Sequence, residues 1–273
     1  MTGRRRPEAL TELGIFALAY VVYFGVRAVT EGTAATAMQH AFDLIELEQR
    51  LGIAWEQAVQ DAVVRSGIFL DAANAVYIYG HWPVIIVGGI LLFRYRRRHY
   101  YVLRNAALLS GLVGLVIFAL FPVAPPRLTD LPLVDTVTRE AEGYRQVVPQ
   151  ALVNQYAAMP SFHAGWNVLL GIVVFRATSH WLLRALAIAG PAAMSLAVVA
   201  TANHFVVDVI AGIAIVLAGL ALLRVAERVK RRRTLVRAYE YKRAGAVHRR
   251  PPGRERSPAP TGGGSAAAPA RRG

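Results

Sequence analysis

The sequence predicts an all-α integral membrane protein, a bundle of six transmembrane helices with a helical segment at the outer membrane interface. Two observations carry this prediction: 55% of the 273 residues are hydrophobic and only 18% are charged, and the apolar residues fall in long runs without a polar face. Because a hydrocarbon core of ~30 Å needs about 20 residues of helix, we assign spans to residues 13–29, 68–93, 105–121, 160–175, 181–200 and 204–223.

The composition excludes several other classes of protein. Disordered chains are not this apolar, and a chain without cysteine is neither a disulfide scaffold nor a Cys-ligated metalloprotein. The net charge of +14 does not indicate nucleic-acid binding, because residues 228–273 hold 14 of the 31 basic residues and two acidic ones, which leaves only +2 on the rest. We therefore expect a cytoplasmic N-terminus (1–12), a six-helix membrane domain (13–227) and a disordered basic cytoplasmic tail (228–273).

Charge asymmetry predicts the orientation of the bundle. With six spans, the arginines near residues 4–6, 94–104 and 176–184 and the basic tail all fall on one side of the membrane. The segments 30–67 and 122–159, which carry more acidic than basic residues, fall on the other. The positive-inside rule then places both termini in the cytoplasm of a bacterial-type plasma membrane. Segment 30–67 has helical spacing of apolar residues and is interpreted as the interfacial segment.

Two ionisable residues in the last span indicate chemistry, because charges inside a membrane are costly. His204 and Asp208 lie four residues apart and so share one face of a helix. The carboxylate can accept from one imidazole nitrogen and leave the other free and more basic. Asn203 is expected to cap this helix, which places His204 at its positive, outward end.

Two further outward elements complete a candidate site. Pro160 suits the first turn of the fourth span, where Ser161 and free backbone amides could receive an anion or Ser161 could simply cap the helix. Arg127 follows three prolines at the end of the third span. This set favours phosphoryl transfer: His204 attacks phosphorus, Asp208 orients it, His163 protonates the leaving oxygen, and Arg127 with helix-end amides holds the phosphate. No metal or other cofactor is expected, because no span carries a cluster of acidic residues.

These motifs resemble those of a known family. Ala-Pro-Pro-Arg (124–127), Met-Pro-Ser-Phe-His (159–163) and His-Phe-Val-Val-Asp-Val (204–209) are similar to the three motifs of the type 2 phosphatidic acid phosphatase superfamily, and most similar to its inositol phosphorylceramide synthase-like, inositolphosphotransferase branch. The resemblance covers roughly residues 70–225. It implies six helices, an outward active site in bacteria, a metal-free reaction and a phosphohistidine intermediate, with His204 as nucleophile, Asp208 as its orienting residue and His163 as general acid.

The chain departs from the phosphatase branch of that family at several motif positions. Leu120 stands where the first motif has Lys, and Leu128 where Pro follows the Arg. Phe162 replaces a Gly of the second motif, and Ala197 and Val198 replace the Ser-Arg of the third. Two phosphate-binding cations are therefore missing, which favours either a singly charged phosphodiester or a more solvated phosphate. The synthase-like branch lacks the same Arg.

Additional polar residues are candidates for binding substrate. Four residues of the second span recur at helical spacing: Asp71, Asn74, Ile78 and His81. One interpretation is that they line a pocket for a polar alcohol. The other is that His81 bonds a carbonyl freed by Pro83 and that Asp71 lies in the membrane interface. Asn154 and Tyr156 precede the second motif and are further candidates.

We therefore expect a lipid phosphotransferase that moves a phosphate or a phospho-head-group, such as phosphoinositol, from a lipid to an alcohol at the outer membrane face. The alternatives are a phosphatase that hydrolyses phosphatidate or a polyprenyl (pyro)phosphate, with water as acceptor, and a catalytically inactive lipid-binding relative. The expected partners are a membrane lipid or polyprenyl phosphate and a polar alcohol or water, not nucleic acid. The sequence leaves the lipid and the oligomeric state open.

Overall fold

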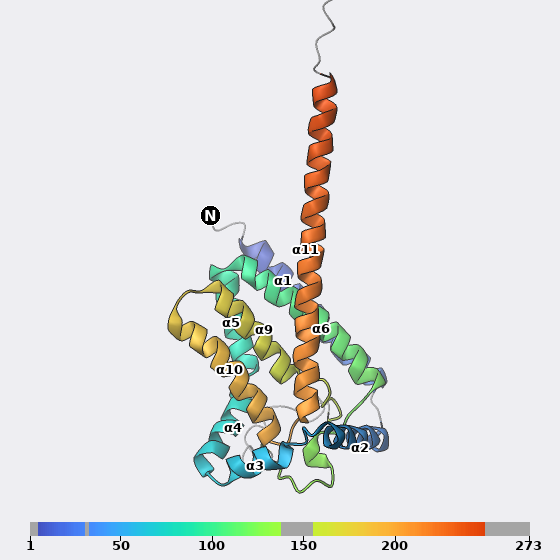
Figure 1. Cartoon of the computed structure of the whole chain (residues 1–273), viewed down its shortest axis with the longest axis vertical. Coiled ribbons are helices and arrows are strands. Elements are labelled where there is room, and N and C mark those ends of the chain that lie inside the picture. Colours follow the sequence, from blue (N-terminus) through green and yellow to red (C-terminus); the bar gives the residue numbers. More distant parts are fainter. Residues whose placement is uncertain (1–4, 31–32, 138–154, 249–273) are drawn as a thin grey trace, which may run out of the picture. The chain divides into compact units, whose positions relative to one another are not determined.

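The protein is all-helical throughout the part described by the computed structural model, which covers the backbone of residues 5–30, 33–137 and 155–248 (Figure 1). Its helices are α1 (Arg5–Thr30), α2 (Ala34–Leu51), α3 (Glu56–Val64), α4 (Gly67–Tyr79), α5 (Trp82–Tyr95), α6 (Arg97–Leu120), the 3₁₀ turn η1 (Pro126–Leu128), α9 (Phe162–Ala177), α10 (Trp181–Ala200) and α11 (Val206–His248). One isolated parallel bridge joins Val123 to Ala157. The predicted α-helical membrane bundle is confirmed.

Four described helices are long and apolar enough to cross a membrane by themselves. They are α1, α6, α10 and α11, and a fifth span results if the bent pair α4–α5 is counted as one. The remaining predicted span, the fourth, corresponds to α9, whose 16 residues extend about 24 Å at the rise of an α-helix. Helix length and composition therefore support four or five of the six predicted crossings.

The second predicted span is not one continuous helix. The chain breaks between α4 and α5, and the two helices are bent by 51°. Pro83 lies in the first turn of α5, where its missing N–H costs nothing, whereas in a helix interior its ring would clash with the preceding turn. The expected stripe from Asp71 to His81 on a single helix face is therefore wrong, because His81 belongs to the break and not to α4.

The segment predicted to lie at the interface forms α2 and α3, which lie across the end of the bundle where α11 begins (Figure 1). Thr33 caps α2 through a side-chain bond to the amide of Thr36, and Gly52 ends it with a left-handed φ of 69°. His40 donates to the Pro122 carbonyl at 2.7 Å, which ties α2 to the segment that follows α6. Gln60 likewise ties α3 to the Ala200 carbonyl at the end of α10.

A close crossing of α9 and α11 positions the residues of interest. A Cβ on Gly165 would stand 2.6 Å from the Gly212 carbonyl oxygen, and a Cβ on Gly212 would overlap the Ser161 carbonyl. Two helices can approach this closely only where both carry small residues. The crossing brings the start of α9 against the first turns of α11, so that the amide of Ser161 donates to the Asp208 carbonyl at 2.9 Å.

The opposite ends of the spans carry the basic residues. Arg96 donates to the Ala177 carbonyl at 3.2 Å and thereby joins the α5–α6 and α9–α10 connections. Arg104 pairs with Glu12 of α1 at 2.5 Å. This end of the bundle corresponds to the predicted basic side, and the motif residues occupy the other end.

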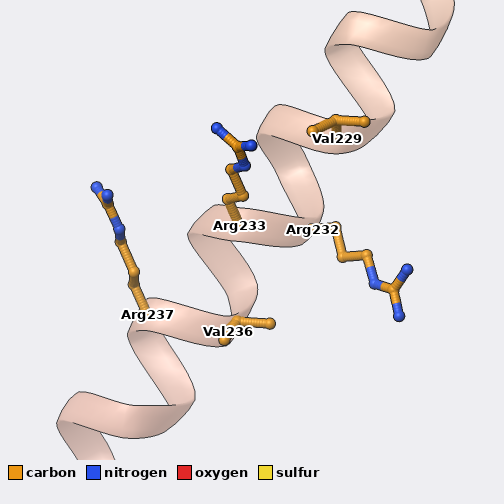
Figure 2. A pocket seen from close by; sticks show the side chains of 5 residues that line it. All are labelled: Val229, Arg232, Arg233, Val236 and Arg237. Carbon is orange, nitrogen blue, oxygen red and sulfur yellow. The ribbon is translucent and has the colours of Figure 1, made fainter.

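The chain divides between Val225 and Ala226 into two units. In the second unit α11 continues to His248, so the first part of the expected disordered tail is helical, while residues 249–273 lie outside the described part. Val229 and Val236 form a shallow apolar hollow with three arginines around it, and Figure 2 shows Arg233 and Arg237 projecting from one side of the helix and Arg232 from another. The hollow contains none of the predicted catalytic residues.

The glycine crossing leads to a stability prediction. We expect Gly212→Leu to destabilise the protein by about 1–3 kcal/mol or more. The new side chain would clash with the Ser161 carbonyl, and this backbone group can shift only if the two helices separate. Thermal unfolding in detergent measures this. Gly190→Leu on α10 is the matched control, because nothing lies within 4 Å of a Cβ there. Equal melting temperatures for the two variants would contradict the crossing.

Candidate active site

His204 lies in a tight turn between α10 and α11. The turn comprises Thr201 to Phe205, and the amides of Asn203 and His204 both donate to the Val198 carbonyl at 3.1 Å. The sequence-based assignment of Asn203 as helix cap and of His204 to the helix itself is therefore wrong, because α11 begins at Val206. His204 is nonetheless buried beside the positive end of that helix.

The imidazole of His204 has a defined tautomer. Its Nδ1 lies 2.7 Å from the Ala158 carbonyl oxygen and 3.5 Å from Oδ2 of Asp208. Both neighbours are acceptors, so Nδ1 carries the proton and Nε2 keeps its lone pair. The carbonyl of Ala158 is the closer partner, and sequence reasoning missed it because a backbone group has no residue-type signature.

Asp208 is fully buried in the first turn of α11. Its Oδ2 accepts from the Phe205 amide at 2.8 Å. A side chain of the first helical turn thereby satisfies the amide that precedes the helix. Within the described part of the chain, Oδ1 makes no hydrogen bond. Hydrogen bonds at catalytic sites are often long without substrate. Because this carboxylate has not used all of its acceptor sites, the 3.5 Å contact between Asp208 and His204 can shorten into a hydrogen bond.

His163 lies next to His204, with ring centroids 5.7 Å apart. It occupies the first turn of α9, and its ring stacks on Tyr77 of α4 at 4.9 Å. The structure thus brings together the predicted nucleophile and the predicted general acid, which are 41 residues apart in the chain.

His81 forms the third member of this histidine cluster. Its ring is 4.3 Å from that of His163, and its Nδ1 is 3.1 Å from the side-chain nitrogen of Asn167. That nitrogen also donates to the His163 carbonyl at 2.8 Å, which fixes the amide orientation. His81 Nδ1 is therefore the acceptor and Nε2 carries the proton. Asn167 was missed by sequence reasoning, although a buried Asn in an apolar span is itself a signal.

The remaining predicted residues differ in how close they lie to the histidines. Arg127 donates to Oδ1 of Asn203 at 2.5 Å and lies 3.5 Å from Asp135, so it is held beside the His204 turn. Ser161 is fully buried and caps α9 by accepting from the Ala164 amide at 3.4 Å. Pro160 precedes this cap and so lies outside the first helical turn in which the sequence placed it.

The other predicted substrate residues have different surroundings, and one of them lies outside the described chain. Tyr156 packs against a core cluster that includes Phe205. Asp71 is exposed on α4, and no contact links it to the histidines among the described residues. Asn154 falls outside the described residues. The roles of Tyr156 and Asp71 stay predictions.

A family model of the PAP2 superfamily matches residues 42–222, which is most of the chain. The chain belongs to the PAP2 superfamily. Neither a curated protein nor a solved structure matches it at a significant level.

The departures from the PAP2 motifs have structural explanations. The Phe162 ring projects onto α6, where it contacts Gly114 and packs edge-on against Phe118. Val198, which replaces an Arg, is fully buried in the apolar core. Leu120, which replaces a Lys, is 77% exposed. Among the described contacts, Arg127 is the one cationic side chain brought to the site.

Two buried glutamates, from α2 and α3, bind backbone amides at the start of α11, and neither was predicted from the sequence. Glu48 of α2 accepts from the Val207 amide at 2.7 Å, and Glu56 of α3 accepts from the Val206 amide at 2.8 Å. Burial, together with a hydrogen bond to Glu56, raises the pKa of Glu48 to about 9. The signal in the sequence is positional: Glu48 continues the buried stripe of Ala37, Ala41 and Leu44 on α2.

The site offers no evident place for a metal ion. No group of three or more His, Asp or Glu side chains is arranged as metal ligands in the described ranges. The three histidines instead contact one another by their ring faces and edges. Metal independence stays a prediction.

The raised pKa of Glu48 predicts how stability varies with pH. The folded protein keeps the proton up to about pH 9, whereas the unfolded chain releases it near 4.5. Between these values the unfolded state binds fewer protons, so stability falls as pH rises. We expect Glu48→Gln, which has no proton to lose, to flatten this fall in a series of thermal melts.

The control for this series is Glu46→Gln on the same helix. The Glu46 side chain is 62% exposed and pairs with Arg50. We expect this variant to keep the wild-type pH dependence. An unchanged slope in Glu48→Gln would show that Glu48 is ionised in the folded protein.

Proposed function

We propose that the protein is a lipid phosphotransferase that works through a phosphohistidine at His204. The observation that carries this proposal is the fixed tautomer of His204: Nδ1 is engaged by Ala158 and Asp208, which presents Nε2 as a nucleophile. His163 lies beside it in a position to exchange a proton with substrate oxygens. A nucleophile oriented by a second group and adjacent to an acid is the general pattern of covalent catalysis.

The reaction has two steps, phosphorylation of His204 and transfer from His204 to the acceptor. Nε2 of His204 attacks phosphorus, the bond from phosphorus to the leaving oxygen breaks, and that oxygen takes a proton from His163. The acceptor oxygen then attacks phosphorus, the N–P bond breaks, and the acceptor's proton returns to His163. Asp208 stabilises the positive charge that the His204 ring acquires in each step.

Phosphate oxygens are bound at the start of α9 and not at the start of α11. The first-turn amides of α11 at Val206 and Val207 are already taken by the two glutamates. In contrast, the amides of Phe162 and His163 make no hydrogen bond within the described chain. These amides and Arg127 form the anion-binding part of the site.

The charge of the site favours transfer of a phosphodiester group over hydrolysis of a monoester. A monoester carries close to two negative charges near neutral pH, whereas a diester carries one, and Val198 and Leu120 replace two cations. We expect the polar alcohol acceptor to bind beside His81 and Tyr77, which adjoin His163. We assign the chain to the inositolphosphotransferase-like branch on these grounds; the alternative is a phosphatase, in which water is the acceptor.

The active site faces outward across the plasma membrane in this proposal. The arginines of the α5–α6 and α9–α10 connections lie at the opposite ends of the helices that carry the motifs. The positive-inside rule places those connections in the cytoplasm. Both termini are then cytoplasmic.

The proposed intermediate is tested by trapping. Purified protein in detergent with EDTA is incubated with ³²P-labelled dioctanoyl phosphatidic acid or phosphatidylinositol, with and without inositol or glycerol, and quenched in alkali. We expect labelled protein that His204→Ala abolishes. His180→Ala is the control, because His180 is exposed at the start of α10.

The products separate the two reactions. A labelled head-group ester formed with the alcohol supports transfer, and free phosphate formed with or without alcohol supports the phosphatase alternative. Full turnover by His204→Ala would contradict the nucleophile assignment. Absence of any turnover by the wild type would favour an inactive lipid-binding relative.

A pair of matched variants separates the two aspartates of the sequence prediction. Asp208→Asn keeps an acceptor for the Phe205 amide but removes the charge that supports His204, so we expect kcat to fall by at least about a hundredfold. Asp71→Asn makes the same change on the exposed face of α4, and we expect less than about a threefold effect. Equal effects of the two variants on steady-state kinetics would count against the His204–Asp208 pair.

A further inference from the structure

The first turn of α11 is capped by two carboxyl groups that come from other helices. Helix amino-termini leave amides without intrahelical partners, and a local Ser, Thr, Asp or Asn usually satisfies one of them. Here Asp208 satisfies the Phe205 amide locally, while Glu56 and Glu48 reach the next two amides from α3 and α2. Three separate elements thus converge on the turn that follows His204.

Both glutamates are buried, with Glu48 only 1% exposed and Glu56 4% exposed. Glu48 faces Glu56 on α3, to which its carboxyl is hydrogen-bonded, and Asp208 on α11, and no described cation contacts either glutamate. Two adjacent carboxylates cannot both ionise cheaply in a dry environment. The raised pKa of Glu48 agrees with a single proton shared by the two groups.

Simple helix capping does not require this arrangement. One buried acid is costly and two are more so, and neutral Gln or Ser at the same positions could accept from the amides. What the pair adds is one negative charge close to a helix end that would otherwise attract the substrate phosphate. That end lies within three residues of the nucleophile.

We propose that Glu48 and Glu56 are positioning residues for phosphoryl transfer that act as one singly charged acid pair. The pair holds His204 and Asp208 in place at the start of α11. It also keeps the substrate phosphate away from that end of the helix. The inference rests on the proposed function. Loss of the shared proton places two charges in contact and displaces the turn. The pair therefore predicts an alkaline limit to catalysis that a merely structural contact would not produce.

The experiment compares glutamine variants, because glutamine resembles a protonated glutamate. In Glu48→Gln the amide oxygen still accepts from Val207 and the NH₂ group donates to Glu56, so the hydrogen bonds of the pair survive without a titrating proton. In the double variant Glu48→Gln/Glu56→Gln two donors face each other and the hydrogen bond between them is lost. Glu46→Gln is the exposed control on α2.

Turnover of dioctanoyl phosphatidic acid and dioctanoyl phosphatidylinositol is measured from about pH 6 to about pH 10, with thermal melts at each pH. We expect Glu48→Gln to keep kcat within about threefold of wild type near pH 7 and to lose the alkaline fall in kcat. We expect the double variant to lose at least about tenfold in kcat with little change in KM while it remains folded, because small displacements of a nucleophile are costly. Glu46→Gln should follow the wild type throughout.

Two results would overturn the inference while leaving the proposed function intact. One is an alkaline limb in Glu48→Gln identical to that of the wild type, and the other is a fully active double variant, each with turnover that still requires His204. Turnover that persists in His204→Ala, or no turnover of either lipid by the wild type, would instead overturn the proposed function. The His204→Ala arm therefore distinguishes the two failures.

Discussion

The amino-terminal turn of α11 is the constraint on which the rest of the site depends. It has to place an imidazole and a carboxylate within contact inside an apolar bundle, where backbone groups without partners are expensive. Most of its buried polar groups are accordingly bonded: the Val198 carbonyl accepts from two amides, the Ala158 carbonyl accepts from His204, and the Ser161 amide donates to the Asp208 carbonyl. The glycines at the crossing of α9 and α11 are needed because these bonds require the two backbones to lie close together.

The same turn explains why the starts of α9 and α11 have different roles at the site. Both α9 and α11 begin beside the histidines, and both would attract an anion through their dipoles and first-turn amides. At α11 the amides are bonded to carboxyl groups of the protein, on Asp208, Glu48 and Glu56, while α9 is capped by the neutral Ser161. Among the described residues, the Phe162 and His163 amides at the start of α9 therefore have no partner, whereas the Val206 and Val207 amides at the start of α11 are bonded.

Much of this arrangement was predictable from the sequence because its determinants are local. The three motifs and their order indicated which helix ends meet, and the positions of the arginines indicated which end of the bundle they occupy. The break at Gly80–His81 was misjudged because an uninterrupted apolar run conceals the effect of Pro83 on backbone geometry. The extension of α11 to His248 was missed because a basic composition resembles that of disordered tails.

The parts that could not be predicted depend on contacts between distant segments. Glu48 and Glu56 lie about 150 residues from the amides they bind, and no spacing rule links them to the motifs. The role of Ala158 belongs to its carbonyl, and any residue type supplies one. The tautomer of His204, on which the chemistry depends, thus follows from the fold and not from the motif itself.

The replaced cations give the site its chemical character. Val198 is buried in the core and Leu120 is exposed, so in the proposed reaction a substrate phosphate meets one arginine and the amides of α9. The acid pair at α11 adds a negative charge on the other side. A dianionic phosphate would be repelled by this balance, whereas a diester needs less positive charge and keeps a leaving alkoxide for His163 to protonate. Under the proposed function, the missing cations and the buried acids therefore act in the same direction, toward a singly charged phosphodiester.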